Sequence, residues 1–213
     1  MSDALGPLPV AEALRAGAAA YNAGEYAAAR AVWAGTDSES GTPPLLDGLA
    51  AFADAVARGR QGEWTAATAA ADRATERLDS DDIDGRGVTV AALRRWLDAF
   101  RADPERIERR PVPPVSVAGE HPVPGTLSLA AAGAVASVVA DRAGYDTDVV
   151  ADAVRFARAE EHPAASNYAT FLRDFVGDPA QRPIIFQRLS GMVERERRKE
   201  RDVDGLFDES DEA

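Results

Sequence analysis

The sequence has no cysteine and only one lysine, Lys199, among its 213 residues. The lack of cysteine excludes disulfides, zinc–thiolate sites and thiol nucleophiles. Only 7% of the residues are aromatic, whereas hydrophobic residues make up 46%, and much of that share is alanine. Small side chains of this kind favour helices that pack closely. We therefore expect an all-α protein.

Long apolar runs and catalytic motifs are also missing. The longest apolar stretch, residues 127–140, is shorter than the ~20 residues of a membrane span. The first ten residues lack a basic region followed by an apolar run, so we expect no signal peptide. There is no glycine-rich phosphate loop and no Gly-x-Ser-x-Gly motif, and His121 and His162 each precede a proline without a second ligand nearby. The sequence thus predicts no catalytic residue, cofactor, metal site or membrane partner.

The charge is strongly negative, because 36 Asp and Glu residues outnumber 24 Lys and Arg residues and give a net charge of −12. In composition, this acidic, alanine-rich chain with one lysine resembles haloarchaeal proteins. We interpret it as a protein of a salt-rich cytoplasm, and the alternative is an ordinary soluble protein with a strongly solvated surface. In multimolar salt the Debye length is ~3 Å or below, so only close or desolvated charge contacts matter.

Residues 14–78 contain one motif twice, 38 positions apart. Gly24-Glu25-Tyr26 and Gly62-Glu63-Trp64 are each followed, one residue later, by two alanines. Because glycine tolerates a positive φ, we expect each copy to turn a helical hairpin. The helices are expected at about 9–22, 25–34, 45–58, 63–78 and 88–102. Such tetratricopeptide-like pairs normally need three units for a solenoid, so we predict a compact helical-hairpin bundle over residues 9–102.

The second half starts beyond a proline-rich stretch. Six prolines exclude a helix through most of residues 103–126, which we interpret as a linker. A second small helical bundle is expected over residues 127–201, and its last helix is expected to pack through apolar residues that include Ile184 and Leu189. Residues 202–213 are acidic, and we predict a disordered tail.

The first third of the chain resembles the domain-of-unknown-function family 309, whose members are small all-helical proteins. The matching residues lie over about 11–78 in the family's order and are Tyr21-Asn22-Ala23-Gly24-Glu25-Tyr26, Ala29, Val32-Trp33, Gly48-Leu49 and Gly62. The family's His-Glu pair is replaced here by Arg30 and Ala31, its closing Glu by Ala34, and its Gly-Asn by Gly62-Glu63. The resemblance therefore implies the fold and implies no site.

Arg30 is the candidate binding residue of the hairpin bundle. It lies between Tyr26 and Trp33 at helical spacing, so these side chains can meet. Asp47 and Glu63 can pair with it across the hairpins. One interpretation is a groove in which these five residues bind an anion or a partner. The other is that Arg30 only covers the aromatic packing.

Two further stretches are candidate contact surfaces. The apolar pair Leu206-Phe207 is either a docking peptide or a segment that pins the tail onto its own domain. The cations of the last helix, among them Arg188 and Arg195, are a candidate nucleic-acid stripe. Glutamates on the same helix and the net charge of −12 argue against nucleic acid.

The leading hypothesis is therefore a non-enzymatic protein-interaction or scaffold protein of a halophilic cytoplasm, with a protein partner. The first alternative is a small-molecule or anion-binding protein, or an enzyme, that uses Arg30 in the hairpin groove. The second alternative is a nucleic-acid-associated protein that uses Arg188, Arg195, Arg198 and Arg201.

Overall fold

The computed structural model of the chain describes residues 7–36, 43–79 and 87–208, with side chains as far as Asp202. Within these ranges it contains ten α-helices, two short 3-10 helices and no β-strand, which confirms the prediction of an all-α helical bundle. No helix in the described part combines the length and the apolar composition that a membrane crossing needs.

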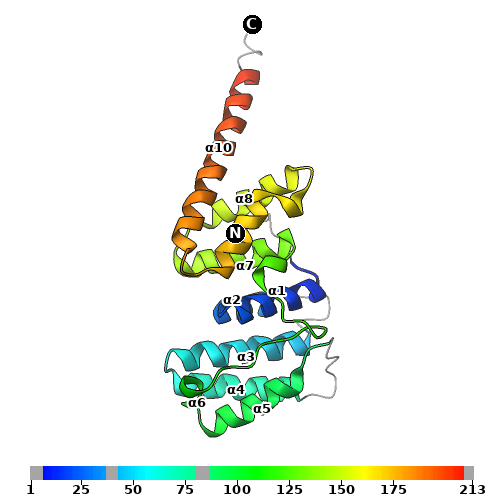
Figure 1. Ribbon diagram of the computed structural model, residues 1–213, viewed down its shortest axis with the longest axis vertical. Coiled ribbons are helices and arrows are strands. Elements are labelled where there is room, and N and C mark those ends of the chain that lie inside the picture. Colours follow the sequence, from blue (N-terminus) through cyan, green and yellow to red (C-terminus); the bar gives the residue numbers. More distant parts are fainter. Residues whose placement is uncertain (1–6, 37–42, 80–86, 209–213) are drawn as a thin grey trace.

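The first five helices follow one another in space in their chain order (Figure 1). They are α1 (Val10–Asn22), α2 (Tyr26–Ala34), α3 (Pro44–Arg60), α4 (Trp64–Leu78) and α5 (Val90–Ala102). The turn glycines Gly24 and Gly62 have φ angles of 85° and 73°, a conformation that side chains with a Cβ rarely adopt. The repeated motif thus turns two hairpins, as its glycines predict.

Close contacts between helices explain why the hairpins are rich in alanine and glycine. The Trp33 indole is fully buried against Gly17, where an added Cβ would lie 2.3 Å from the indole Nε1. The same nitrogen donates a hydrogen bond to the Leu14 carbonyl oxygen at 3.3 Å. In the second hairpin Gly48 makes room for Leu78, whose Cδ2 would lie 2.7 Å from an added Cβ. Each hairpin therefore depends on one glycine for its close packing.

The second half continues the same stack. Its elements are α6 (Arg106–Arg109), η1 (Pro124–Thr126), α7 (Leu129–Ala143), α8 (Thr147–Ala159), η2 (Pro163–Ala165), α9 (Asn167–Gly177) and α10 (Arg182–Asp208). Helix α7 packs against α1 and α2, on the side of this hairpin away from α4 and α5 (Figure 1). The buried side chains of both halves belong to one continuous core. The two halves are thus joined by packing as well as by the linker.

The proline-rich segment is more structured than a flexible linker. The Asn22 side chain donates to the carbonyl oxygens of Val115 (3.0 Å) and Pro122 (3.1 Å) and accepts from the Val115 N–H (2.9 Å). Arg15 pairs with Glu120 at 3.2 Å, and Val117 is buried. The segment also contains α6 and η1. Hydrogen bonds from α1 therefore fix its course along the hairpin stack.

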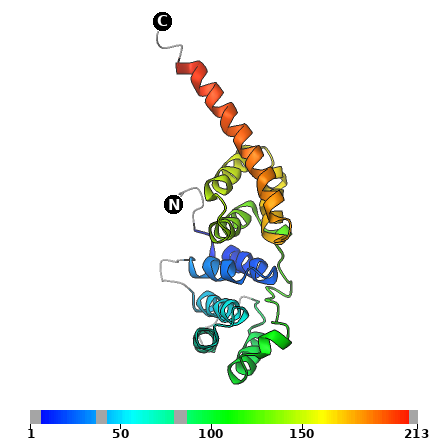
Figure 2. The ribbon, with the colours of Figure 1, turned by 90° about the vertical axis from the view of Figure 1, so that its left-hand side faces the viewer.

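Helix α10 is 27 residues long and extends past the rest of the molecule (Figure 2). The prediction of a disordered tail is wrong for residues 202–208, which continue this helix. Extending an existing helix needs no new nucleus, so a polar segment can follow a well-packed one. Leu206 and Phe207 lie in this part of α10, and their side chains are outside the described ones; residues 209–213 also lie outside the described ranges.

Candidate functional site

The structure separates two residues from the predicted Arg30 groove. Trp33 lies in the core and therefore does not line an open surface. The Asp47 carboxylate pairs with Arg77 of α4 at 2.8 Å instead of with Arg30. Tyr26 is half-buried and packs against the core. The five predicted residues thus do not form one binding site.

Arg30 belongs instead to a cluster around Asp54 of α3, which is only 7% exposed. Asp54 is 3.5 Å from Arg30, 3.1 Å from Arg58 and 3.2 Å from Arg73, and Arg58 also pairs with Glu63 at 2.8 Å. The negative charge and hydrogen bond of Asp54 raise the pKa of Arg58. The sequence signal for this cluster is an aspartate inside an alanine-rich run with an arginine four residues later.

Glu25, the acidic residue of the first motif copy, connects the two halves of the chain. Its Oε1 lies 2.5 Å from Nη2 of Arg182, and the two side chains are 22% and 12% exposed. Arg182 also donates from Nε to the Phe175 carbonyl oxygen at 2.9 Å, and its guanidinium lies over the Phe175 ring. Because Arg182 is the first residue of α10, this contact fixes the start of α10 against the first hairpin turn.

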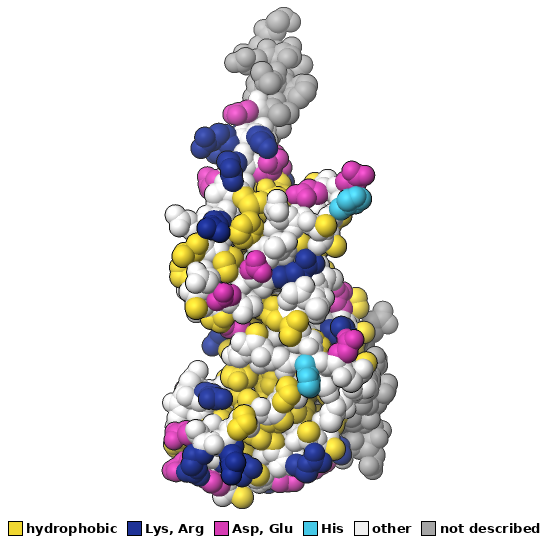
Figure 3. Space-filling view, in the orientation of Figure 1, with side chains coloured by type: hydrophobic (Ala, Val, Ile, Leu, Met, Phe, Trp, Pro, Cys, Tyr) yellow, Lys and Arg dark blue, Asp and Glu magenta, His cyan; other side chains and the backbone are white. Residues whose placement is uncertain are grey.

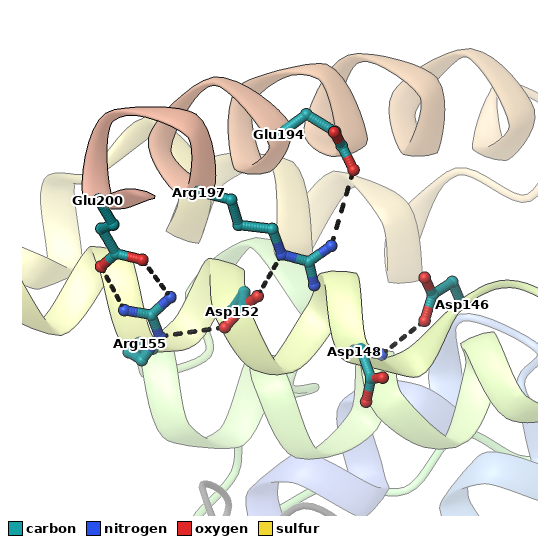
Figure 4. A network of polar contacts seen from close by, with 7 residues as sticks. All are labelled: Asp146, Asp148, Asp152, Arg155, Glu194, Arg197 and Glu200. Atoms are coloured by element: carbon teal, nitrogen blue, oxygen red, sulfur yellow. Dashed lines mark hydrogen bonds and ion pairs between the residues drawn. The ribbon is translucent and has the colours of Figure 1, made fainter. Parts of the chain in front are cut away.

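A second set of ion pairs holds the middle of α10 to α8 (Figure 4). Asp152 accepts hydrogen bonds from Nε of Arg155 at 3.0 Å and from Nε of Arg197 at 2.5 Å. Arg155 also donates two hydrogen bonds to the Glu200 carboxylate, at 2.5 and 2.9 Å. Glu194 lies 3.7 Å from Arg197. The direction of α10 is therefore fixed at two points, Arg182 and this network.

The network shifts the pKa values of Asp152, Arg155 and Glu200. Partial burial raises the pKa of Asp152, but hydrogen bonds from Arg197 and Arg155 outweigh it and lower this pKa below its usual 3.8. The hydrogen bond from Arg155 lowers the pKa of Glu200 below its usual 4.5, and the same bond raises the pKa of Arg155. Asp152, Arg155 and Glu200 are therefore charged near neutral pH, and their ion pairs hold α10 in place.

An open groove runs between α9 and α10, with η1 at one end. It consists of two hollows of about 610 and 550 Å³, and Arg188 lines both. Its apolar lining residues are Pro124, Phe171, Ile184, Ile185 and Met192, and its other charged lining residues are Arg173, Asp174, Asp178 and Arg195. Most of the apolar lining comes from α9 and α10. The hollow next to η1 also contains Arg173 and two carboxylates, whereas the charged residues of the other hollow are the α10 cations Arg188 and Arg195. We call this feature the α9–α10 groove.

The α9–α10 groove exposes an apolar side chain that the helical pattern placed in the core. Ile184 is 50% exposed, whereas Leu189 and Val193 are fully buried. At 3.6 residues per turn, Ile184 lies about 140° around α10 from Leu189 and about 180° from Val193. The prediction that Ile184 packs inward is therefore wrong, and this angular offset is the sequence signal that identifies it as a surface residue.

Arg188 is the cation at the centre of the groove. Its side chain is exposed, and no hydrogen bond or ion pair joins it to another residue in the described ranges. Sequence reasoning assigned Arg188 only to a nucleic-acid stripe. The structure places it between apolar side chains, where a guanidinium next to exposed hydrophobic surface is typical of protein interfaces.

Comparisons with known proteins give no relative for this chain. No protein-family model matches it, and neither a curated protein nor a solved structure does. The resemblance of residues 11–78 to the domain-of-unknown-function family 309 stays a prediction. Among the described residues, no group of three or more Asp, Glu and His side chains is arranged to hold a metal ion.

Proposed function

We propose that the protein is a non-enzymatic interaction or scaffold protein whose contact surface is the α9–α10 groove and the outer face of α10. The observation that carries this proposal is that one open groove is lined by Ile184, which is 50% exposed, and by Arg188, which forms no ion pair with any described residue. The hollow between Phe171, Met192, Arg188 and Arg195 is apolar and cationic, which suits a partner segment with apolar and acidic side chains, whereas Asp174 and Asp178 line the other hollow. A salt-rich cytoplasm suits such a surface, because apolar and close charge contacts persist when long-range attraction is screened.

The projecting part of α10 supports the same proposal. The network of Asp152 and Arg155 attaches α10 to the body as far as Glu200. Beyond that residue the helix continues to Asp208, which adds about 12 Å at 1.5 Å per residue. A helical arm that extends beyond its own body is suited to contact another protein chain.

Affinity capture from native extract in multimolar KCl tests the proposal. We expect partner proteins to bind the wild-type chain and to be lost from Ile184→Glu and Arg188→Glu. Arg142→Glu is the matched control, because it removes an exposed cation on α7, away from the groove. A partner set that is the same for all four proteins would contradict the proposal, provided that thermal melts show all four to be folded.

The Asp54 cluster supports a second candidate function, the binding of a small anion. Three guanidinium groups, each 38–57% exposed, converge on one carboxylate, so they keep N–H donors that face solvent. Thermal melts in phosphate and chloride at equal ionic strength test this candidate. Phosphate is expected to stabilise the wild-type chain more than Arg30→Ala or Arg73→Ala, and equal stabilisation of all three would contradict it.

A further inference from the structure

Residues 111–117 form an extended segment on the hairpin stack, which we call the strap. Three of them are prolines, at positions 111, 113 and 114, and a residue that precedes proline is restricted to an extended backbone. Residues 111–114 take part in no backbone–backbone hydrogen bond within the described ranges. Figure 1 shows the strap passing from α6 across α3, and Figure 3 shows hydrophobic side chains gathered on the same face. The strap is therefore held by what the helices offer it and not by its own backbone.

Asn22 holds the strap by its backbone. The Asn22 Oδ1 accepts from the Val115 N–H at 2.9 Å, and the Asn22 Nδ2 donates to the Val115 carbonyl oxygen at 3.0 Å. One side-chain amide thus satisfies both backbone polar groups of one extended residue, as an adjacent strand does. Because these two hydrogen bonds use only the backbone, another extended segment can form them in the same way.

The Val115 side chain is the anchor of the strap. It is 1% exposed and belongs to the continuous core, whereas Pro111 and Pro114 are exposed and Val112 and Pro113 are half-buried. One side chain of this segment therefore enters the core directly beside the backbone contacts of Asn22. When an extended peptide is recognised, hydrogen bonds to its backbone supply affinity and a pocket for a side chain supplies specificity. Both parts are present at Val115.

The groups that hold the strap are positioned by the helices. Asn22 is the last residue of α1, and Thr89 directly precedes α5. The Thr89 hydroxyl oxygen lies 2.5 Å from the hydroxyl oxygen of Ser116, the residue after the anchor. Helices α1 to α5 pack against one another in chain order, without the strap between them. The site is therefore built by the helical stack, whichever segment fills it.

We propose that this face of the stack is a recognition site for an extended, proline-containing peptide with a valine-sized anchor, and that the strap occupies it as an internal competitor. The partner is a segment of another protein with this chemistry. Prolines keep such a segment extended before it binds, so binding costs little conformational entropy. The attached strap competes at a high effective concentration, so a partner segment enters when the strap is loosened. The site lies away from the α9–α10 groove, and the proposal does not rest on that groove.

Fluorescence anisotropy with a labelled peptide of residues 110–123 tests the proposal on the full chain in multimolar KCl. Val115→Asp places a carboxylate at the buried anchor, which releases the strap because an unpaired buried charge is costly. We expect the peptide to bind this variant and not the wild-type chain, whose strap fills the site. Val123→Asp is the matched control, since Val123 is 47% exposed. Adding Asn22→Ala to Val115→Asp is expected to weaken peptide binding by about tenfold, because two hydrogen bonds to the anchor are lost.

Binding that appears in Val115→Asp, is absent in Val123→Asp and weakens with Asn22→Ala would support the proposal. A folded Val115→Asp chain that binds no more peptide than the wild-type chain would overturn it, and so would binding that Asn22→Ala leaves unchanged. Equal binding of a peptide with Asp in place of Val115 would also overturn it, because the anchor would then not be recognised. If circular dichroism shows that Val115→Asp is unfolded, Val115→Ala decides, since it only shortens the anchor: tighter binding than to the wild-type chain supports the site, and equal binding overturns it. Each of these results leaves the capture experiment on the α9–α10 groove unaffected.

Discussion

Glu25 and Glu63 occupy the same position in the two copies of one motif, so they form a matched pair for comparing a partly buried ion pair with an exposed one. Glu25 pairs with Arg182, and these side chains are 22% and 12% exposed. Glu63 pairs with Arg58, and these side chains are 47% and 38% exposed. A change to glutamine removes one negative charge in either case. Any relief of the general repulsion in this acidic chain is therefore the same for both variants.

We expect Glu25→Gln to lower the free energy of unfolding by about 3 kcal/mol, the low end for a buried pair that loses one partner, because this pair is only partly buried. The cause is that Arg182 keeps its charge in a site with little water, where its hydrogen bond to the Phe175 carbonyl oxygen holds it in place. Glu63→Gln is expected to cost about 0.5 kcal/mol or less, because both partners reach solvent. For a chain of this size the first change lowers Tm by about 6–12 °C.

Urea unfolding followed by circular dichroism in multimolar KCl measures both values. Arg182→Leu alone and combined with Glu25→Gln completes a double-mutant cycle, in which most of the loss is expected to be shared by the two residues. Equal effects of Glu25→Gln and Glu63→Gln would refute the reasoning. So would a cycle in which the two losses simply add, because the contact between the halves would then not depend on this ion pair.

Three further predictions follow from the same structure. Gly17→Ala is expected to lower the free energy of unfolding by about 1–3 kcal/mol in urea, because its Cβ would overlap the buried indole of Trp33. Gly191→Ala is the control, since the space around it is open, and it is expected to be neutral or to stabilise by up to about 1 kcal/mol. A similar loss in both variants would contradict this packing. Arginines hold the pKa values of Asp152 and Glu200 below their usual 3.8 and 4.5, although partial burial opposes this at Asp152. The two carboxylates therefore contribute to stability at pH values above their usual pKa, and this contribution is lost as the pH falls through their lowered pKa values. On acidification, Tm is expected to fall less steeply in Asp152→Asn than in the wild-type chain, and an unchanged slope would count against the network. Asn22→Ala is expected to speed proteolysis within residues 110–123, because three hydrogen bonds to that segment are lost, and an unchanged cleavage rate would show that the segment is held by other contacts.

The local features of the fold could be predicted from the sequence. The turns at Gly24 and Gly62 depend on backbone conformation, and a glycine beside a helical pattern indicates them directly. The burial of Trp33 could not be predicted in the same way. On α2 it lies only about 60° from Arg30 around the axis, and the choice of which side chain enters the core depends on the space that Gly17 leaves on another helix.

The long-range contacts could not be predicted, because they join residues far apart in the chain. Asn22 holds a segment more than ninety positions away through Val115, and Glu25 finds its partner at Arg182. Many arginines in the sequence are equally suitable partners for Glu25, and only the stacking of α7 on the first hairpin selects among them. The exposure of Ile184 could be predicted from the sequence, because Ile184 lies on a different face of α10 from the buried Leu189.

The measurement that tests the α9–α10 groove as a contact surface most directly is cross-linking from a single cysteine placed in it. The natural sequence has no cysteine, so a thiol-reactive photo-crosslinker on Ile184→Cys is attached at the groove alone. We expect this variant to link to a partner protein in native extract at multimolar KCl, and Arg142→Cys on α7 not to do so. Equal linking from both positions, or no linking from position 184, would contradict the account.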